Sequence, residues 1–405
     1  MKNALKFALF LSATCAGAHA QVTPAAMAGA ANLGYSLRYS HVAEFGGGIR
    51  DRQAGTASGS VRYSNDSTRL PFDLKYSGGY TRNLAGPSYS NGFFQRMLLS
   101  QGIVWRKWDL FLSDDVSYRP QAPTIGFSGI AGTGEPIGGS GPNPPSSESI
   151  LTLNTRVVNN VAHGDVNHLL NYAMTLSFGG SSDLLRFPDG NGLDTNSQSA
   201  NAGLTWRLNA RKSFSSQYVF SRFTYPDSGF SIDTHSGLVG FKRVWNRAIT
   251  TSASAGPEWI ASSDSSTVPS SIMFAANASV NYAFRGGMAD VTYRRGTTGG
   301  SGYLLGSESD AIFAGFSREF ERKLTIELSG GYRRTAGLHK NEVIEGEFAG
   351  AQANRRLGKY LGVFANYTVT TQSSSAALPT NTLHHMLQVV SFGIGYTSRE
   401  AHLSH

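Results

Sequence analysis

The chain has 405 residues, of which 11% are aromatic, 15% are charged and 47 are glycine, and its formal net charge is +8 at pH 7. A helical membrane protein needs runs of about 20 consecutive apolar residues. The sequence has no such run, which excludes that class. The basic residues are dispersed rather than gathered in a patch, which argues against nucleic acid as a partner.

The first twenty residues have the pattern of a secretory signal peptide. Lys2 and Lys6 precede the apolar stretch Phe7–Leu11, and an Ala-His-Ala cleavage site ends at Ala20. We therefore expect residues 1–20 to be removed and Gln21 to begin the mature chain, with a periplasmic lead over 21–32. The single cysteine, Cys15, lies inside this signal, so the mature chain offers no disulfide and no thiolate metal site.

From Leu33 to Thr397 the sequence is a series of segments in which apolar and polar residues alternate. The clearest is Lys323–Thr335, KLTIELSGGYRRT, where every second residue from Leu324 to Tyr332 lies on one face of an extended strand. Segments of this kind recur about eighteen times, and they reach the roughly 9–11 residues that a tilted strand needs to cross a bilayer. Other examples are Leu33–Ser40, Phe72–Tyr80, Leu170–Phe178 and Ile272–Phe284.

The connections between these segments alternate in length. The predicted tight turns are Asn65–Thr68, Arg106-Lys107, His163–Asp165, Asn209–Arg211, Asn246-Arg247, Arg285–Gly287, Glu321-Arg322 and Gly358-Lys359. The predicted long loops are Ala43–Ala54, Arg82–Gly92, Arg119–Glu148, Ser181–Asn196, Thr224–Ser231, Ala261–Pro269, Gly296–Ser307, Ala336–Ile344 and Gln372–His385. Short periplasmic turns and long extracellular loops are typical of bacterial β-barrels, and they give an even strand number.

Aromatic residues gather near the predicted strand ends. Those expected to form a girdle at the membrane–water interface are Trp105, Trp108, Trp206, Trp245, Trp259, Tyr360 and Tyr396. Amphipathic rings prefer that interface. The alternative is that they pack in the core of a soluble sandwich, where they need not crowd around one set of turns.

The last strand, Met386–Thr397, carries an aromatic and aliphatic face. With this strand the chain resembles the Gram-negative outer-membrane β-barrels, including their porin-like members. The resemblance implies an all-β fold over 33–397: a single antiparallel transmembrane barrel of about eighteen strands, with sixteen as the alternative. One departure is the tail over 398–405, because many such proteins end on an aromatic residue.

The resemblance also implies a location and a set of partners. The location is the outer membrane, and the partners are outer-membrane lipid and lipopolysaccharide, the barrel-assembly machinery and small hydrophilic solutes. A homotrimer is an oligomeric state that the resemblance allows.

The polar strand faces would line the lumen. The basic residues placed there are Arg38, Arg62, Lys75, Arg96, Arg156, Arg207, Lys242, Arg294 and Arg333, and the acidic ones are Asp73, Asp109, Asp115, Glu258, Asp290, Glu319 and Glu327. Charge inside a pore sets its ion selectivity, so the basic excess predicts a weak anion preference. The alternative is a ladder of mutually paired charges that holds the interior together.

Two loops could add to the function. Arg119–Glu148 is rich in glycine and proline, and loops of this length are usually functional or disordered. It could fold inward as a constriction or stay on the surface as a mobile loop. On another loop, Asp189, Asn191 and Asp194 offer oxygen ligands for Ca²⁺, but the full ligand pattern is missing and an ordinary turn is favoured.

The sequence therefore predicts a porin-like channel that passes small hydrophilic solutes by diffusion, without cofactor, metal or catalysis. The first alternative is a structural component of the outer membrane associated with exopolysaccharide export. The second is a barrel-embedded hydrolase, which would need a serine or aspartate within hydrogen-bond reach of a histidine at one rim.

Overall fold

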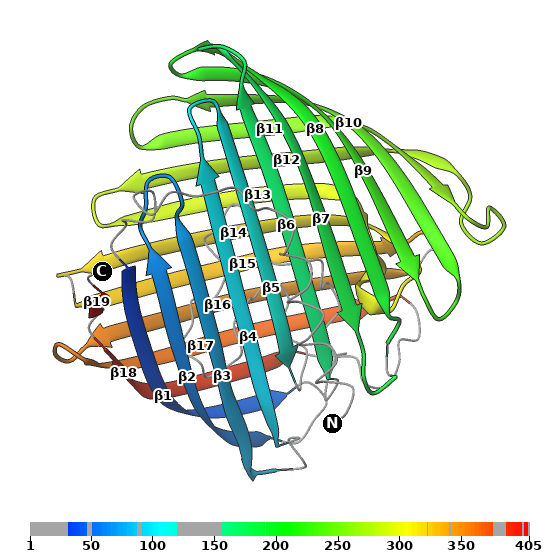
Figure 1. The fold of residues 1–405 in the computed structure, drawn as a ribbon. Helices are drawn as coiled ribbons and strands as arrows, with labels where there is room; N and C mark the ends of the chain where they lie inside the picture. The colour runs from blue at the N-terminus through cyan, green and yellow to red at the C-terminus, as the bar shows by residue number, and fades with distance from the viewer. Residues whose placement is uncertain are drawn as a thin grey trace.

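The computed structural model describes residues 31–46, 51–86, 91–119, 156–190, 192–321, 323–339, 342–375, 386–398 and 401–403. Within them a closed antiparallel barrel of eighteen strands forms, as expected. In Figure 1 the strands of the near wall, β1 to β9, cross those of the far wall at a steep angle. No helix among the described residues is long and apolar enough to cross a membrane.

Each strand pairs with its neighbours in the chain, and β1 pairs with β18 to close the barrel. In the closing ladder Ser36 lies opposite Thr397 and Gly46 lies opposite Leu387. The strands are β1 (Ala31–Gly46), β2 (Arg52–Asn65), β3 (Phe72–Ala85), β4 (Gly92–Val104), β5 (Trp108–Arg119), β6 (Val157–Leu169), β7 (Met174–Arg186), β8 (Thr195–Asn209), β9 (Lys212–Tyr225), β10 (Phe230–Val244), β11 (Ile249–Ser262), β12 (Ser271–Phe284), β13 (Gly287–Thr298), β14 (Ser307–Phe320), β15 (Leu324–Gly337), β16 (Val343–Arg356), β17 (Leu361–Ser374) and β18 (Leu387–Thr397).

The segment after β18 returns to the wall. A short strand, β19 (Ala401–Leu403), pairs with Ala31–Leu33 at the start of β1. The backbone groups of β1 beyond the end of β18 thus gain partners, which matters because an unpaired strand edge is costly inside a membrane.

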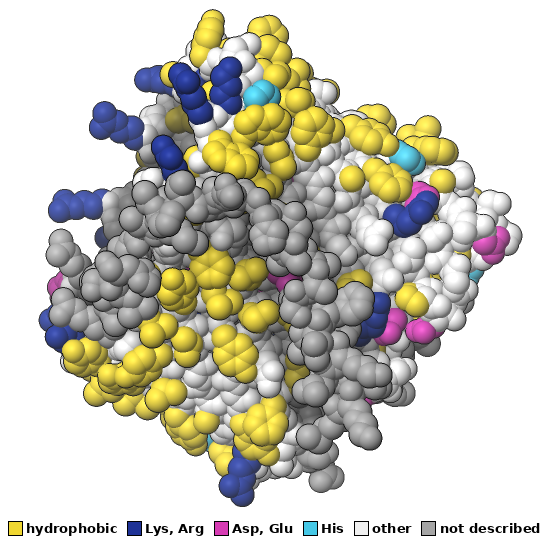
Figure 2. Space-filling model, viewed as in Figure 1, with side chains coloured by type: hydrophobic (Ala, Val, Ile, Leu, Met, Phe, Trp, Pro, Cys, Tyr) yellow, Lys and Arg dark blue, Asp and Glu magenta, His cyan; other side chains and the backbone are white. Residues whose placement is uncertain are grey.

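Alternation along each strand separates an outward apolar face from an inward polar face. Large hydrophobic residues such as Leu37, Tyr76 and Leu328 are among those left exposed on the outside. Figure 2 shows hydrophobic side chains spread over the outer surface in that view. A wide exposed apolar surface is rare on soluble proteins and is the surface that lipid covers on a membrane barrel.

One predicted turn is wrong. His163–Asp165 lies inside β6, and the turn comes later, over 170–173. There the side-chain oxygen of Asn171 accepts the backbone N–H groups of Ala173 and Met174, both at 2.9 Å. The turn carries Leu170 and Tyr172, which are apolar and exposed, so its sequence looks like a continuing strand.

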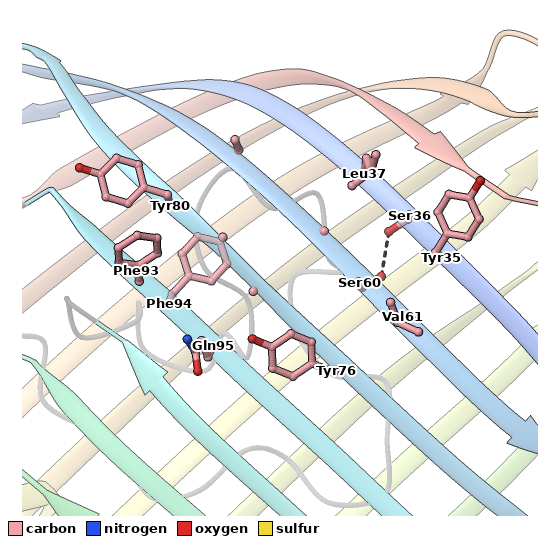
Figure 3. A pocket seen from close by; sticks show the side chains of 14 residues that line it. Tyr35, Ser36, Leu37, Ser60, Val61, Tyr76, Tyr80, Phe93, Phe94 and Gln95 are labelled. Atoms are coloured by element: carbon pink, nitrogen blue, oxygen red, sulfur yellow. Dashed lines mark hydrogen bonds between the residues drawn. The ribbon is translucent and has the colours of Figure 1, made fainter. Parts of the chain in front are cut away.

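A groove on the outer surface runs over β1 to β4 (Figure 3). Leu37 flanks it on one side and Phe93 on the other, while Gly59 and Gly78 leave its floor without side chains. Its volume is about 620 Å³. Because it lies on the lipid-facing side of the wall, it is no part of the lumen.

Candidate pore and its outer mouth

The pairing registers place the predicted lumen charges on one side of the wall. Fifteen of the sixteen occupy strand positions that alternate with the outward hydrophobic residues, and so lie on the inward face: Arg38, Arg62, Lys75, Arg96, Arg207, Lys242, Arg294, Arg333, Asp73, Asp109, Asp115, Glu258, Asp290, Glu319 and Glu327. Arg156 differs, because it precedes β6 at the rim and pairs there with Asp189.

Some of these charges neutralise each other. Arg62 donates from Nε to Asp73 at 2.7 Å, and Arg96 donates to both carboxylate oxygens of Asp115 at 3.0 Å and 2.7 Å. Bidentate guanidinium–carboxylate pairs fix both side chains. The β1–β5 side of the lumen therefore contains both paired charges and additional basic groups.

Arg294 and Arg333 lie at one level on the opposite side of the lumen. Both are partners of Ala311 in the strand registers, from β13 and β15, so only a methyl group stands between them along β14. Neighbouring strands are about 4.8 Å apart, which puts their backbones roughly 10 Å from each other. Arg333 lies over the ring of Phe313 at 5.8 Å. Arg294 is exposed, and it makes no ion pair with any described residue.

The wall from β7 to β12 presents mainly hydroxyl and amide groups. Hydroxyls pair across strands in this region: Ser181 with Ser199 and Ser252 with Ser279, each at 2.7 Å. These groups supply hydrogen bonds without fixed charge. This wall also carries Arg207 on β8 and Lys242 on β10, so hydroxyl pairs and charged groups line it together.

The connection between β13 and β14 folds inward at the end of the barrel that carries the long loops. We call residues Gly299–Gly306 the mouth segment. It contains the 3-10 turn η2 (Gly300–Gly302), and Gly300, Gly302 and Gly306 have φ values of 74°, 78° and 72°. Glycine adopts this left-handed backbone without the strain that a Cβ would cause.

Hydrogen bonds tie the mouth segment to three other parts of the wall. The hydroxyl of Tyr225 on β9 donates to the Gly299 carbonyl at 3.0 Å. The N–H of Leu193, between β7 and β8, donates to Gly302 at 2.6 Å, and the N–H of Leu338, after β15, donates to Gly306 at 3.1 Å. The segment therefore crosses part of the mouth rather than lying along the rim.

Apolar packing fills the space beside this segment. We call the buried set Phe223, Tyr225, Phe230, Ile232, Ile260 and Val268 the mouth cluster, against which Leu305 and Leu338 pack. Leu304 packs on Ile344 of β16, while Tyr303 makes an edge contact with Phe187 at 5.8 Å between ring centroids. An apolar cluster thus occupies part of the barrel interior at this end.

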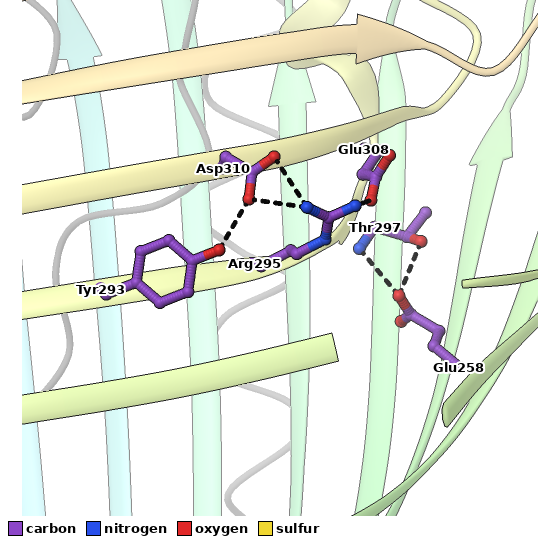
Figure 4. Close-up of polar contacts among 6 residues, drawn as sticks. All are labelled: Glu258, Tyr293, Arg295, Thr297, Glu308 and Asp310. Atoms are coloured by element: carbon purple, nitrogen blue, oxygen red, sulfur yellow. Dashed lines mark hydrogen bonds and ion pairs between the residues drawn. The ribbon is translucent and has the colours of Figure 1, made fainter. Parts of the chain in front are cut away.

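A buried carboxylate fixes the start of the mouth segment. Glu258 on β11 is 5% exposed and accepts hydrogen bonds from the backbone N–H and hydroxyl of Thr297, at 3.1 Å and 2.9 Å. Its other oxygen accepts the hydroxyl of Ser236 at 3.1 Å. Figure 4 shows Glu258 reaching Thr297 at the end of β13. Buried carboxylates are stable only when hydrogen-bonded in this way.

A turn on the neighbouring connection supports the same cluster. Asp264 accepts hydrogen bonds from the hydroxyls of Ser266 and Thr267 at 2.7 Å and 2.6 Å, and these lower the pKa of its carboxyl to about 2. The turn delivers Val268 into the mouth cluster. Sequence reasoning did not single out Asp264, although an Asp-x-Ser-Thr run is a recognisable turn pattern.

The predicted constriction, Arg119–Glu148, lies outside the described residues from residue 120 onward. The inward segment that the structure describes is a different loop, within the predicted connection Gly296–Ser307. Its sequence, GGSGYLLG, combines four glycines with an apolar triplet. An apolar triplet on a surface loop is a feature that could have indicated burial.

The two described acids of the Ca²⁺ candidate face different arginines. Asp189 accepts bonds from Arg156, which lower the pKa of its carboxyl. Asp194 accepts the Phe187 N–H at 2.9 Å and lies 3.6 Å from Nε of Arg186. Asn191 lies outside the described residues. Each carboxylate thus balances a guanidinium within a turn.

Three histidine rings in the described residues form hydrogen bonds, each to a group other than serine. His163 Nε2 lies 2.5 Å from Asp165 on the lumen wall, and His235 Nδ1 lies 2.6 Å from the Tyr218 hydroxyl on the outer surface. His339 at the rim contacts the carbonyl of Thr267 at 2.7 Å. A barrel hydrolase would need a serine or aspartate bonded to a histidine at its rim. The histidine–aspartate pair seen among the described residues, His163 with Asp165, lies midway along β6 instead.

The predicted girdle residues are on the outer surface. The rings lie at strand ends, five of them about half exposed: Trp105, Trp108, Trp206, Trp245 and Trp259. Trp108 stacks on His168 at 4.0 Å, and Tyr360 stacks on Tyr396 at 5.8 Å.

No protein-family model matches the chain. No curated protein matches it either. Among solved structures, Acinetobacter baumannii OccAB3 is similar at 10% identity and a TM-score of 0.45, over 91% of this chain and 99% of that one. Pseudomonas aeruginosa OpdQ is similar at 12% identity and a TM-score of 0.42, over 91% and 98%. Pseudomonas aeruginosa OccK2 (OpdF), in complex with glucuronate, is similar at 12% identity and a TM-score of 0.45, over 91% of this chain and 97% of that one.

Proposed function

We propose that this protein is a porin-like channel of the outer membrane that passes small hydrophilic solutes by diffusion, with its long loops facing outward. The observation that best supports a channel is the polar interior of a closed barrel whose exterior is apolar. A barrel of eighteen strands has an interior wide enough for water. Side chains that face inward near the short turns, such as Arg62, Arg207 and Lys242, are exposed.

The passage narrows at the outer mouth. The mouth segment and the mouth cluster occupy part of the lumen there, so the solute must pass beside them. Arg294 lies four residues before the strand end that leads into this segment, which places an exposed cation close to the narrow level. A charge in a narrow polar passage acts on every ion that passes it.

We infer a weak anion preference from the same residues. Three acids on the wall, Asp73, Asp115 and Glu258, are already engaged by arginine or by hydroxyl and N–H groups. Arg294 makes no such pair among the described residues. The preference would be weak, because Asp290, Glu319 and Glu327 also face inward.

The test is the reversal potential of the refolded protein in a planar bilayer under a KCl gradient. We expect steady current steps and a reversal potential displaced from zero toward the equilibrium potential of chloride. A reversal potential of zero would remove the selectivity but leave the channel. Current absent from protein that shows the heat-modifiable migration of a folded barrel would contradict the channel itself.

A further inference from the structure

Phe111 on β5 is an exposed aromatic residue that faces the lumen. It lies two residues after the inward-facing Asp109, so the alternation along the strand turns its ring inward as well. Its side chain is 45% exposed. The other exposed aromatic residues on the described strands face outward, as Phe178 on β7 does. An apolar ring exposed to water is unfavourable, which suggests that the ring contacts solutes in the lumen.

The strand registers place Phe111 at one end of a row on the inner wall. It pairs with Asp165 on β6, and Asp165 pairs with Gly179 on β7. Gly179 in turn pairs with Asn201 on β8. Strands β5 to β8 are neighbours in the near wall (Figure 1). Because adjacent strands are about 4.8 Å apart, the row extends over about 14 Å. We call Phe111, Asp165, Gly179 and Asn201 the lumen row.

Gly179 leaves a gap over which the polar members of the row converge. A Cβ on Gly179 would clash with Oδ1 of Asp165 and would lie 2.6 Å from Nδ2 of Asn201. These two atoms form no hydrogen bond with the described residues. The other carboxylate oxygen, Oδ2, is 2.5 Å from Nε2 of His163, which fixes the orientation of Asp165. A hydrogen-bond acceptor and a donor are therefore directed at one point.

An acceptor beside a donor matches a hydroxyl group. A hydroxyl can donate to Oδ1 of Asp165 and accept from Nδ2 of Asn201, or two adjacent hydroxyls can divide these roles. An ammonium group has donors alone, so it matches the carboxylate but not the amide. An anion would be repelled by Asp165 and by the nearby Asp109. The polar part of the row therefore favours an uncharged polyol.

We propose that the lumen row binds a neutral sugar in its pyranose form. The C–H face of the sugar ring would pack on Phe111, while its hydroxyls would bond Asp165 and Asn201. The Asp165 side chain is 38% exposed, so the site is open to the lumen. This inference rests on the proposed channel for the route by which the sugar arrives, and it names neutral sugars as a class of solute. Binding itself can be measured whether or not the barrel conducts.

The experiment measures the dissociation constant of methyl β-glucopyranoside for the refolded barrel by isothermal titration calorimetry. The detergent is lauryldimethylamine oxide, which has no sugar headgroup to compete. Phe111→Ala should weaken binding roughly fivefold or more, because the contact with the sugar face is lost. Phe111→Trp keeps an aromatic face and should bind as the wild type does. Phe178→Ala is the matched control, because it removes an equally exposed ring from the outer face. Equal losses in Phe111→Ala and Phe178→Ala would overturn the proposal.

Gly179→Ala tests the convergence of the polar groups. The added methyl group would push aside the ends of Asp165 and Asn201, so binding should weaken several-fold although neither side chain is removed. Gly237→Ala is the matched control, because a Cβ at that strand position meets nothing within 4 Å. Equal affinities in the two variants would show that the gap over Gly179 does not form the site.

Competing ligands and the bilayer test the remaining parts of the proposal. Sorbitol has hydroxyls but no ring face, and equal binding of sorbitol would overturn the role assigned to Phe111. Displacement of the glucoside at equal concentration by arginine or by galacturonate would overturn the preference for a neutral ligand. No binding by the folded wild type would overturn the site even if the barrel conducts. Binding by protein that passes no current would support the site and contradict the channel.

Discussion

Glu258 and Thr297 form a two-bond clamp between β11 and the end of β13: one carboxylate oxygen accepts both the backbone N–H and the hydroxyl of the threonine. Strand β12 separates these two strands in the wall, so the contact passes over its end. The clamp sets the direction in which the chain leaves β13 and enters the lumen. It is therefore the clearest point at which to loosen the mouth segment.

Glu258→Ala should raise the single-channel conductance. The substitution removes charge-assisted hydrogen bonds worth roughly 2–3 kcal/mol and leaves the Thr297 N–H without its partner. The mouth segment should then move away from the passage more often. Glu327→Ala is the matched control, because Glu327 also faces inward but makes no contact with the segment. Equal conductance in both variants would argue against the clamp.

Tyr225→Phe should lower the temperature at which the folded barrel loses its heat-modifiable migration. The change leaves the buried carbonyl of Gly299 without its donor, which costs about 1–3 kcal/mol. Tyr367→Phe serves for comparison, since the hydroxyl of Tyr367 bonds Gln388 on the exposed outer surface at 3.2 Å and can be replaced there by other polar groups. If the two variants lose stability equally, the Tyr225 hydroxyl has no special role in the mouth.

Arg294→Ala should shift the reversal potential in a KCl gradient toward the equilibrium potential of potassium. The residue supplies an exposed positive charge near the narrow level, whereas Arg207 lies at the wide end of the lumen near the short turns. Arg207→Ala should therefore cause a smaller shift, because a charge in a wide aqueous passage is screened by salt. The two shifts should converge as the salt concentration rises. A larger effect from Arg207 would place the selective level at the other end.

Acid should loosen the turn that begins at Asp264. The pKa of this carboxyl is lowered from 3.8 to about 2 by hydrogen bonds from Ser266 and Thr267. A lowered pKa contributes stability above the ordinary value, and that stability is lost as the pH falls through the folded-state value. The protection factor of the Val268 amide, its measured exchange rate relative to the intrinsic rate at the same pH, should therefore fall between about pH 4 and pH 2. In Asp264→Asn this protection should be low already at neutral pH and should show no such acid step.

The barrel was predictable from the sequence because the alternation of apolar and polar residues that defines each strand can be read within a short segment. Alternation with a period of two, as in β15, reports at once that a residue is in a strand and which face it occupies. The sorted connections then gave the strand number. The failure at His163–Asp165 has a physical cause: Gly164 and its polar neighbours resemble a turn, while the true turn at Asn171 carries apolar side chains that suit the membrane interface.

The mouth could not be predicted in the same way. Phe223, Ile260 and Val268 come together only because the closed wall and its registers bring distant segments to one end. The inward path of the mouth segment depends on contacts from β9, β11 and the connection after β7, none of which is local in sequence. The lumen charges were assigned to a face by alternation, but their pairing depended on register, as in Arg96 with Asp115.

The most direct measurement is single-channel conductance of the wild type beside a variant with Tyr303→Ser, Leu304→Ser and Leu305→Ser, which keeps the chain length but removes the apolar contacts of the mouth segment. A water-filled barrel that narrows at this segment predicts steady steps from the wild type and larger steps from the variant. Equal steps would show that the segment does not narrow the path. Silence from both folded proteins would contradict the channel.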